Sequence, residues 1–392
     1  MRTLTARYKQ CLVVSLALLS GLVLIFAFVK PASGAGTLPT GFEQARVVSG
    51  LSIPVAMAFA PDGRLFVTER GGTVRVIKNG ELLTTPFVDL SSKLDTTGER
   101  GLLGIAFDPD FSKNQYVYVY YTQKATGTAA PHNLVARFTA NEDAASASSE
   151  TTILQLPDLG GVIHNGGAIH FGNDDKLYVA VGDNSRRDAA QSLDNLYGKM
   201  LRINKNGTVP KDNPFYKQTT GINKAIWARG LRNPFTFAVQ PGNKNALVYI
   251  NDVGENTWEE IDKGRAGANY GWPLYEGVAN NPSYDDPIFA YGHGSSETTG
   301  CSIAGGAFYN PKSGASTPFP AKYEGDYFFA DWCSGWIRDY DPVTNTVEGF
   351  KASSGFLAEG PVDLQVGPEG DLYFLAYITG SVEKIHYAST AQ

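Results

Sequence analysis

The sequence predicts an all-β protein folded as a six-bladed propeller, and three observations support this prediction. A turn that contains Gly or Asp, followed by a hydrophobic strand, recurs along the chain. The 43 glycines and 21 prolines suit many short strands joined by tight turns. No stretch carries an amphipathic helical period over three turns. A β-sandwich or two stacked β domains is the alternative arrangement of such strands.

The repeat is clearest in three segments: PDGRLFVTE from Pro61, NDDKLYVAVGD from Asn173 and PEGDLYFLAY from Pro368. Each is followed by a second short strand, which reads VRVI at Val74, KMLRIN at Lys199 or VEKIHY at Val382. A turn, a buried strand, a short connection and another strand describe the inner part of a propeller blade.

Three looser segments fill the gaps: NQYVYVYYT from Asn114, NALVYIND from Asn245 and GDYFFADW from Gly325. The six predicted blades are centred on residues 51–79, 101–139, 165–205, 226–265, 300–349 and 355–387. Residues 35–392 are therefore expected to form one propeller domain, in which the last blade packs against the first and closes the ring.

Residues 1–34 have the layout of a secretory signal peptide. Three basic side chains precede an uncharged run from Cys11 to Val29, and small residues follow it. The run is about 19 residues long, which is near the length that spans a bilayer, so an uncleaved N-terminal anchor is the alternative. Either interpretation predicts an exported protein, whether periplasmic, cell-surface or secreted, with no other contact to a membrane.

Charge and missing motifs exclude several classes of function. Residues 1–34 carry four basic and no acidic side chains, so the formal net charge changes from −6 to −10 without them. Such an acidic body argues against nucleic acid as a partner. The chain also has no phosphate-binding P-loop, no G-x-S-x-G nucleophile motif and no His/Cys cluster with zinc spacing.

Beyond Cys11 the chain has two cysteines, Cys301 and Cys333. In an oxidising compartment, two cysteines on neighbouring strands most simply form a structural disulfide. Two buried free thiols are the alternative.

His164 is the most informative of the five histidines. It lies in GVIHNGGAIHFG, directly before glycines that let a ligand approach the backbone closely. Asp183 ends the strand YVAVGD nineteen residues later, so a hairpin of this length can return a carboxylate beside the imidazole. A His held by an Asp is a general base with a fixed tautomer. The alternative is a histidine that merely caps a strand; His170, His293 and His386 have no comparable neighbours.

Polar side chains begin a strand that otherwise reads as buried, in WARGLRNPFTFAV. They are Arg229, Arg232 and Asn233, and polar groups in such a place must find partners. A ligand carboxylate or a developing oxyanion would satisfy Arg232, and a salt bridge to a neighbouring blade would do so equally well.

Carboxylates crowd one segment of the predicted fourth blade: Asp252, Glu255, Glu259, Glu260 and Asp262. Calcium prefers oxygen-rich ligands carried on turns. The spacing is not that of an EF-hand loop, so these residues alone leave a solvated acidic turn as the alternative.

Four segments taken together resemble the successive signatures of the glucose/sorbosone dehydrogenase family, whose members depend on pyrroloquinoline quinone (PQQ). They are GERGLLGIAFDPDF from Gly98, HNGGAIHFGNDDKLYVAVGDN from His164, GLRNPFTFAVQP from Gly230 and GENTWEEIDKGRAGANYGWP from Gly254. Their order and spacing match the family too, over roughly residues 45–387. The resemblance implies a six-bladed propeller that oxidises the anomeric carbon of an aldose by hydride transfer to PQQ, with calcium as a second cofactor.

The resemblance also implies roles for individual residues. His164 would take the proton of the anomeric hydroxyl, and Asp183 would orient His164. Arg232 and Asn233 would lie beside the reactive carbonyls of the quinone, where a fixed cation stabilises developing charge. Glu99 would line the pocket that holds the cofactor and the substrate.

Calcium ligands follow from the same resemblance. The backbone carbonyls of Gly254 and Glu255 would hold a calcium ion that also binds the quinone as a Lewis acid. Glu260 and the carbonyl of Tyr270 would hold a second, structural calcium ion.

The last blade departs from the family pattern. Relatives have two arginines there that clamp the carboxylates of PQQ, whereas this chain has Gly360, Pro361 and Val362. Each lost charge-assisted hydrogen bond is worth about 1.5–3 kcal/mol. PQQ binding is therefore expected to be weaker unless other residues such as Lys351 or Arg338 substitute for the clamp, and arginines introduced at Gly360 and Val362 would restore it.

The residues leave three functions open. The first is the dehydrogenase, which acts on an aldose and passes electrons to an acceptor that the residues do not identify. The second is a non-catalytic binding propeller, as in the Hedgehog-interacting proteins of the same fold. The third is a calcium-dependent lactonase, which would need carboxylates from several blades in the central channel. Retention of four residues together favours the dehydrogenase, namely His164, Asp183, Arg232 and Asn233, and loss of the clamp favours the binding propeller.

Overall fold

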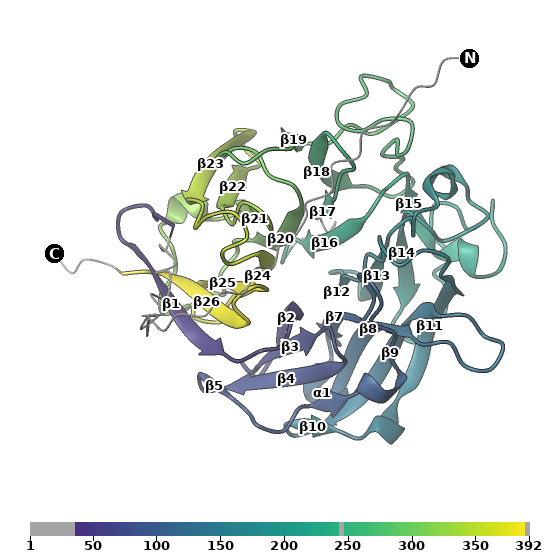
Figure 1. Cartoon of the computed structure of the whole chain (residues 1–392), viewed down its shortest axis with the longest axis horizontal. Helices are drawn as coiled ribbons and strands as arrows, with labels where there is room; N and C mark the ends of the chain where they lie inside the picture. The colour runs from purple at the N-terminus through teal and green to yellow at the C-terminus, as the bar shows by residue number, and fades with distance from the viewer. Residues whose placement is uncertain (1–35, 243–246, 389–392) are drawn as a thin grey trace, which may run out of the picture. The chain divides into compact units, whose positions relative to one another are not determined.

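The computed structural model describes residues 36–242 and 247–388, and almost all their regular structure is β. The strands form six antiparallel sheets of four or five strands, arranged as blades around a central axis (Figure 1). The prediction of a six-bladed propeller is confirmed. The predicted leader, residues 1–34, lies outside the described residues. No helix within the described ranges is long and apolar enough to cross a membrane.

The first three blades follow one another along the chain. Blade 1 contains β2 (Pro54–Phe59), β3 (Leu65–Glu69), β4 (Thr73–Lys78), β5 (Glu81–Leu82) and β6 (Val88–Asp89). Blade 2 contains β7 (Leu102–Phe107), β8 (Tyr116–Gln123), β9 (His132–Asn141), β10 (Ala144–Ala145) and β11 (Thr151–Asp158). Blade 3 contains β12 (Ile169–Phe171), β13 (Lys176–Val181), β14 (Lys199–Asn204) and β15 (Ile226–Arg229).

The other three blades complete the ring. Blade 4 contains β16 (Pro234–Val239), β17 (Val248–Asp252), β18 (Trp258–Gly264) and β19 (Phe289–Gly292). Blade 5 contains β20 (Ile303–Phe308), β21 (Tyr327–Asp331), β22 (Ile337–Asp341) and β23 (Thr346–Lys351). Blade 6 contains β24 (Pro361–Val366), β25 (Leu372–Ala376), β26 (Ser381–Tyr387) and β1 (Phe42–Ser49).

Helical structure in the described ranges is confined to short connections between strands. One α-helical turn, α1 (Phe111–Asn114), joins β7 to β8 in blade 2. The 3₁₀ turns are Ser91–Lys93, Ala147–Ser149, Arg187–Gln191, Gly221–Ala225 and Ala321–Tyr323.

The ring is closed by the first strand of the chain rather than by packing alone. β1 is the outermost strand of blade 6, where it pairs antiparallel with β26, from Phe42 opposite Tyr387 to Ser49 opposite Ser381. The predicted limits of the first and last blades, 51–79 and 355–387, leave this strand out. Its residues lack the repeated turn, so only the pairing across the whole sequence reveals its place.

A second difference lies between blades 3 and 4. The strand that starts at Ile226 was expected to open the fourth blade, but it forms the outer edge of blade 3. There Arg229 pairs with Lys199, and Ala228 with Met200. The long connection from β14 returns the chain to the edge of its own sheet, and the repeat of blade 4 begins only at Pro234.

The hydrophobic core lies between neighbouring blades. Six clusters of buried apolar side chains occur in the described residues, one for each adjacent pair of blades around the ring. Between blades 5 and 6, for example, Phe42 of the closing strand packs edge-on against Phe319 and Phe350, with ring centroids 4.7 and 5.0 Å apart. Burial of such side chains, not local propensity, holds the blades at their mutual angles.

One strand of each blade lines the axis: β2, β7, β12, β16, β20 and β24. Each contacts the next around the ring, and β7 approaches the segment before β12 so closely that a Cβ on Gly104 would lie 2.1 Å from the carbonyl oxygen of Gly167. The N-terminal ends of these strands border one cavity and their C-terminal ends border another. The two cavities are thus the two mouths of the axial channel.

Candidate active site

The cavity at the N-terminal ends of the innermost strands collects most of the predicted site residues. Its volume is about 450 Å³. The predicted residues on its wall are Glu99, His164, Arg232, Asn233, Gly254 and Glu255. They come from blades 2, 3 and 4 and from the loops between them, so segments more than 150 residues apart in sequence meet at one place.

His164 and Asp183 form a hydrogen-bonded pair at this cavity. The imidazole Nδ1 lies 2.8 Å from Oδ1 of Asp183, whose side chain is fully buried. The other ring nitrogen, Nε2, has no hydrogen-bond partner among the described residues, and His164 lines the cavity. Because a carboxylate only accepts hydrogen bonds, it places the proton of a neutral imidazole on Nδ1 and leaves the lone pair on Nε2.

Asp183 is held in place by groups that the sequence analysis did not identify. Its Oδ2 accepts a hydrogen bond of 2.9 Å from the indole Nε1 of Trp272, and its Oδ1 accepts another from the backbone N–H of Ser185. Trp272 lies in the YGWP end of the fourth family-like segment, so the motif contained it without revealing its partner. Three donors on a buried carboxylate fix its orientation.

The backbone explains why this pair forms where it does. His164 has a φ of 55°, a left-handed conformation that turns the chain between β11 and β12. Its carbonyl accepts from the N–H of Asn184, which follows Asp183 after β13. A Cβ on Gly182 would lie 2.2 Å from the carbonyl oxygen of His164, so only glycine allows the two segments to approach.

Arg232 and Asn233 are anchored by Asp252 at the end of the neighbouring strand β17. The two oxygens of Asp252 accept from the backbone N–H groups of Arg232, at 2.8 Å, and Asn233, at 2.7 Å. Burial raises the pKa of Asp252 to about 7, against the opposing effect of these hydrogen bonds. The guanidinium of Arg232 donates to the carbonyl of Val253 and has no ion-pair partner among the described residues. The salt bridge to a neighbouring blade, which the sequence left open for Arg232, is not formed within the described part of the chain.

Glu99 reaches the same place from the loop before β7. Its Oε2 accepts a hydrogen bond of 2.6 Å from the backbone N–H of His164. The residue is exposed, so its carboxylate also meets the cavity. The hydrogen bond to Glu99 therefore stabilises the turn at His164.

The Gly254–Glu255 turn is organised by Glu276, another residue that the motifs did not identify. One oxygen of Glu276 accepts from several successive N–H groups, beginning with Glu255 at 2.6 Å and Asn256 at 3.1 Å. The carbonyl oxygens of Gly254 and Glu255 accept no hydrogen bond within the described structure, so both are available to a ligand. The side chain of Glu255 pairs with Arg187.

Glu260 and Tyr270 border a small separate cavity, beside the main one, that they share with Arg232, Asp252 and Gly254. Its volume is about 10 Å³, close to the room that one water molecule needs. Gly254 thus borders both cavities, whereas Glu255 borders the main one and Glu260 and Tyr270 border the small one.

A buried carboxylate that does not itself line this small cavity, Asp262, interacts electrostatically with Glu260 and Asp252, which do. Both side-chain oxygens of Asp262 are buried without a hydrogen-bond partner in the described structure. Burial, and then repulsion from Glu260 and Asp252, raises the pKa of Asp262 well above its usual value. Buried carboxylates without partners are the ordinary sign of a missing cation, so the residues present fit a calcium ion. Among the described residues no three His, Cys, Asp or Glu side chains form a ready cage, so backbone oxygens would have to complete its coordination.

Cys301 and Cys333 are joined in a disulfide beside the main cavity, with Cα atoms 5.7 Å apart. Cys301 lines the cavity, and its backbone N–H donates to Oδ2 of Asp331, which also accepts from Ser302. The disulfide and Asp331 thus hold the segment between β19 and β20 against the end of β21.

The substitutes expected for the missing clamp are not at the cavity. Nζ of Lys351 lies 2.6 Å from Glu359 and is fully buried, and Arg338 packs on Trp336 in a different, outer cavity. Neither side chain lines the main cavity, so neither replaces the missing clamp there. The wall in the last blade is apolar instead and includes Val362.

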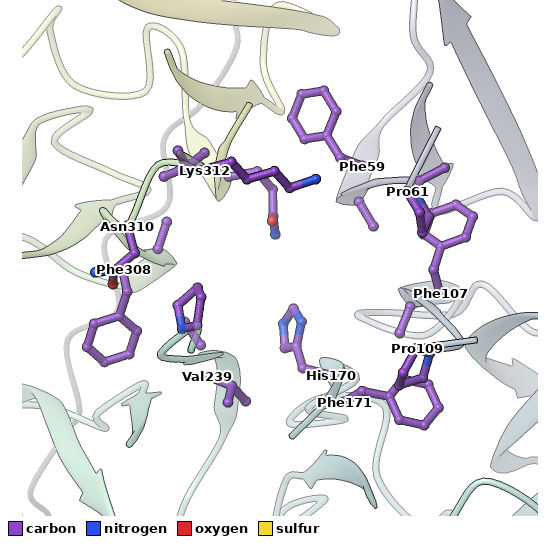
Figure 2. A pocket seen from close by; sticks show the side chains of 18 of the residues that line it. Phe59, Pro61, Phe107, Pro109, His170, Phe171, Val239, Phe308, Asn310 and Lys312 are labelled. Carbon is purple, nitrogen blue, oxygen red and sulfur yellow. The ribbon is translucent and has the colours of Figure 1, made fainter. Parts of the chain in front are cut away.

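The larger cavity, of about 790 Å³, lies at the other mouth of the channel (Figure 2). Aromatic rings such as Phe59 and Phe107 surround it, and His170 and Lys312 point into it. Burial lowers the pKa of His170 to about 4, so this imidazole is neutral at ordinary pH. None of the predicted site residues lines this cavity, and size alone does not identify the candidate site.

The fold and the smaller cavity together define a β-propeller that carries a histidine–aspartate pair, an arginine and an acidic turn at one mouth of its channel. Among known families, the one described as Glucose / Sorbosone dehydrogenase matches residues 51–376. The chain belongs to this family of PQQ-type sugar dehydrogenases, as the sequence motifs predicted.

Individual relatives agree with the family match. Aldose sugar dehydrogenase YliI of Escherichia coli is 30% identical over 355 residues, which are 83% of this chain and 87% of that protein. Quinoprotein glucose dehydrogenase B of Acinetobacter calcoaceticus is 30% identical over 305 residues, 70% of this chain and 62% of that protein. The crystal structure of the soluble aldose sugar dehydrogenase from Escherichia coli in the apo-form superposes with a TM-score of 0.75 at 25% identity, covering 88% of this chain and 99% of that one.

Proposed function

We propose that this protein oxidises the anomeric carbon of an aldose, with PQQ as the hydride acceptor and calcium as the accompanying ion. The observation that carries the proposal is the His164–Asp183 pair, whose free nitrogen belongs to a cavity wall that also holds Arg232 and Asn233. When bound, PQQ supplies the two-electron oxidant that accepts the hydride.

His164 acts as the general base in this proposal. Nε2 takes the proton of the anomeric hydroxyl while the C–H hydride leaves, so that a carbonyl forms and the sugar becomes its lactone. Asp183 keeps the other proton on Nδ1 and stabilises the imidazolium that results. Trp272 holds Asp183 through its second oxygen, which prevents the carboxylate from turning away.

Arg232 and Asn233 supply the fixed polar groups of the site. The backbone of both residues is held by Asp252, so the guanidinium and the amide are oriented before any ligand binds. A pre-oriented cation stabilises negative charge that develops during hydride transfer better than a mobile one does. The Oδ1 of Asn233 is already used by the N–H of Gly166, which leaves its amide N–H₂ for a ligand.

Calcium fits at two places in this proposal. The carbonyls of Gly254 and Glu255 would hold the ion at the main cavity, and Glu260 with the Tyr270 carbonyl would hold the structural ion. The unpartnered oxygens of Asp262, two residues from Glu260 on the same strand, support the second site, to which the resemblance alone did not assign Asp262.

The proposed location is outside the cytoplasm, on the strength of the leader-like residues 1–34. The disulfide between Cys301 and Cys333 supports this, because such bonds persist in oxidising compartments. The proposed partners are an aldose and an electron acceptor, with no nucleic acid.

The lactonase alternative finds no support in the cavity. Its wall carries two carboxylate side chains in the described residues, Glu99 and Glu255, and Glu255 is paired with Arg187. A catalytic metal at the axis would need several converging carboxylates. The binding propeller is the second candidate, because the apolar wall at Val362 lacks the expected clamp.

The test uses the purified full chain, mixed with PQQ and calcium chloride and assayed by dye-coupled oxidation of a panel of aldoses. We expect a changed quinone absorption spectrum on binding, a further change when an active aldose is added, and steady dye reduction. Protein treated with chelator and given no calcium is the control. If no quinone binds and no aldose is oxidised, the dehydrogenase proposal is rejected and the binding propeller takes its place.

A further inference from the structure

The cavity wall holds two basic side chains to which neither the motifs nor the proposed mechanism assigns a role. They are Arg70, which follows β3 in blade 1, and His293, which follows β19 in blade 4. Together with Arg232 and the general base His164, they are the basic side chains on this wall in the described structure. PQQ carries three carboxylates, and these need cationic partners when they leave water.

Arg70 keeps an unneutralised charge at the cavity. Its Nη1 donates a hydrogen bond of 2.6 Å to the carbonyl of Gly98, and it forms no ion pair in the described part of the chain. The side chain packs over Gly101, where a Cβ would lie 2.6 Å from Cγ of Arg70. The guanidinium is therefore positioned by neutral groups, and its remaining donors are available to an anion.

The imidazole of His293 is hydrogen-bonded to a buried carboxylate. Its Nε2 lies 2.7 Å from Oε1 of Glu259, whose side chain is fully buried. The hydrogen bond to Glu259 raises the pKa of His293 and favours the imidazolium, whose Nδ1–H is then a charged donor. Glu259 also accepts from the backbone N–H groups of Ile303, at 2.9 Å, and Gly254, at 3.3 Å.

The loop that carries His293 is fixed at both ends. The N–H of His293 donates to Thr257, and Gly294 is hydrogen-bonded to Gly300, directly before the disulfide at Cys301. A ring held by its backbone, by Glu259 and by a crosslinked loop loses little conformational entropy when it binds a ligand. Such pre-organisation is typical of a binding residue.

The part of the wall that blades 5 and 6 form carries no charged side chain among the described residues. It includes Trp332, Val362 and Tyr377, and the rings of Trp332 and Tyr377 contact each other edge-on with centroids 5.9 Å apart. Lys351 and Arg338 lie elsewhere. A multiply charged ligand would therefore find its charged partners at blades 1 and 4, which are separated by two blades in either direction around the ring.

We propose that Arg70 and His293 bind carboxylate groups of the cofactor and replace a clamp in the last blade. This inference rests on the proposed function, since it assumes that the cavity holds PQQ. It adds two residues from outside the family-like segments, and it leaves Trp332 and Tyr377 as an apolar platform for a ring face.

Affinity for the quinone tests the inference without any turnover. PQQ is titrated into the calcium-loaded full chain, and binding is followed by quenching of tryptophan fluorescence and by equilibrium dialysis. The variants are Arg70→Gln and His293→Gln, with Arg338→Gln as the matched control, because Arg338 is a half-buried cation outside the cavity. Removal of one charge-assisted bond should weaken binding by roughly 10- to 100-fold for each variant, and not for the control.

A second probe guards against variants that fold poorly. The trimethyl ester of PQQ keeps the rings and lacks the three charges, so wild-type protein should bind it much more weakly than PQQ. Arg70→Gln should lower the affinity for PQQ but not the affinity for the ester. The ratio of the two affinities should therefore be smaller than in the wild type. The melting temperature of each variant shows whether it is folded.

The outcomes separate the inference from the function on which it rests. If the wild-type protein binds no PQQ at all, the proposed function is rejected, and the inference with it. If it binds PQQ but also binds the ester equally well, or if both variants bind PQQ as Arg338→Gln does, the carboxylate assignment is wrong and the dehydrogenase proposal stands.

Discussion

At the scale of single residues, the site depends on pairs that the fold brings together. His164 and Asp183 are close enough in sequence for a hairpin to join them, so the sequence could predict their contact. His293 and Glu259 are 34 residues apart on either side of a long loop, and nothing in the sequence indicates that β18 and β19 bring them together. Motifs thus identify residues whose neighbours are local, and they miss partners that arrive from other strands.

His164→Ala should suppress aldose-dependent dye reduction by about 10²–10⁴-fold, the usual contribution of a general base. Binding of PQQ should change little, because the base acts on the substrate proton. The rate of Asp183→Asn should lie between the rates of this variant and of the wild type. An amide can donate as well as accept, so it no longer restricts the imidazole to one tautomer. Dye-coupled rates measured beside fluorescence titrations with PQQ check both statements. A His164→Ala protein that keeps its full rate would remove the base assignment.

Introducing one arginine into the last blade should strengthen cofactor binding, but the position matters. Val362 faces the cavity, so Val362→Arg should tighten PQQ binding by roughly 10-fold or more, as one charge-assisted bond predicts. Gly360 has a φ of 62°, and a Cβ there would lie 2.8 Å from Ile378 and 2.9 Å from Trp332. Gly360→Arg should therefore lower the melting temperature instead of restoring a clamp, contrary to what the sequence suggested. Equal gains in affinity from both substitutions would contradict this account.

At the scale of elements, strand β18 and the disulfide-linked segments of blade 5 have features that the sequence predicted only in part. The acidic segment was recognised, but its assignment to calcium depended on resemblance to a family. Only the structure shows that Asp262 is buried without a hydrogen-bond partner. The residue opposite it on β17 is the apolar Ile250, which offers no polar side chain. The predicted start of the fourth blade at Ile226 was wrong for the same reason. The sequence indicates where strands lie, but the sheet to which each strand belongs depends on its pairing.

Calcium should stabilise the wild-type protein, by about 2.7 kcal/mol at a hundredfold excess over its dissociation constant. Asp262→Asn should lose most of this response, because it removes a carboxylate at the structural site. In excess chelator the same variant should be more stable than wild type by about 1–3 kcal/mol, since the buried unpartnered carboxylate is gone. Thermal melts with and without calcium measure both effects, with exposed Asp194→Asn as the matched control. An unchanged melting curve of the wild type in chelator would dismiss the calcium assignment.

The disulfide should contribute about 2–4 kcal/mol to the free energy of unfolding, as crosslinks of this kind typically do. The double variant Cys301→Ser/Cys333→Ser should therefore melt at a lower temperature, and reduction of the wild type should produce the same shift. Because the disulfide fixes the loop of His293, the variant should also bind PQQ more weakly. A variant with lower stability but unaltered affinity would show that the crosslink does not position this loop.

At the scale of the whole molecule, the ring and the packing of its last blade against the first were predictable, but the strand that completes the last blade was not. Six repeats of turn and strand imply a closed array, because each blade must bury both of its faces. Which strand completes the last sheet is a property of the entire chain, and β1 has no repeat signature of its own. The closing strand nevertheless contributes Phe42, which packs against Phe319, Phe350 and Tyr387.

Phe42→Ala should destabilise the entire propeller, since it removes the buried ring that attaches the closing strand. Loss of a buried phenylalanine costs about 3–5 kcal/mol. Phe356→Ala, at a side chain that is 65% exposed, is the matched control and should have almost no effect. Chemical denaturation followed by tryptophan fluorescence compares the two. Similar midpoints for both variants would mean that β1 is dispensable for closure.

Pairing of β1 with β26 places Phe42 opposite Tyr387, so the first and last strands of the chain are hydrogen-bonded neighbours. The polypeptide is in this sense almost circular. A short linker could join these two strands, and new ends could be opened in an exposed turn such as the one at Gly314, where an added Cβ would meet no neighbouring atom. The order of the blades along the chain could therefore be permuted. Their order around the axis must be kept, because the residues of the main cavity come from several blades.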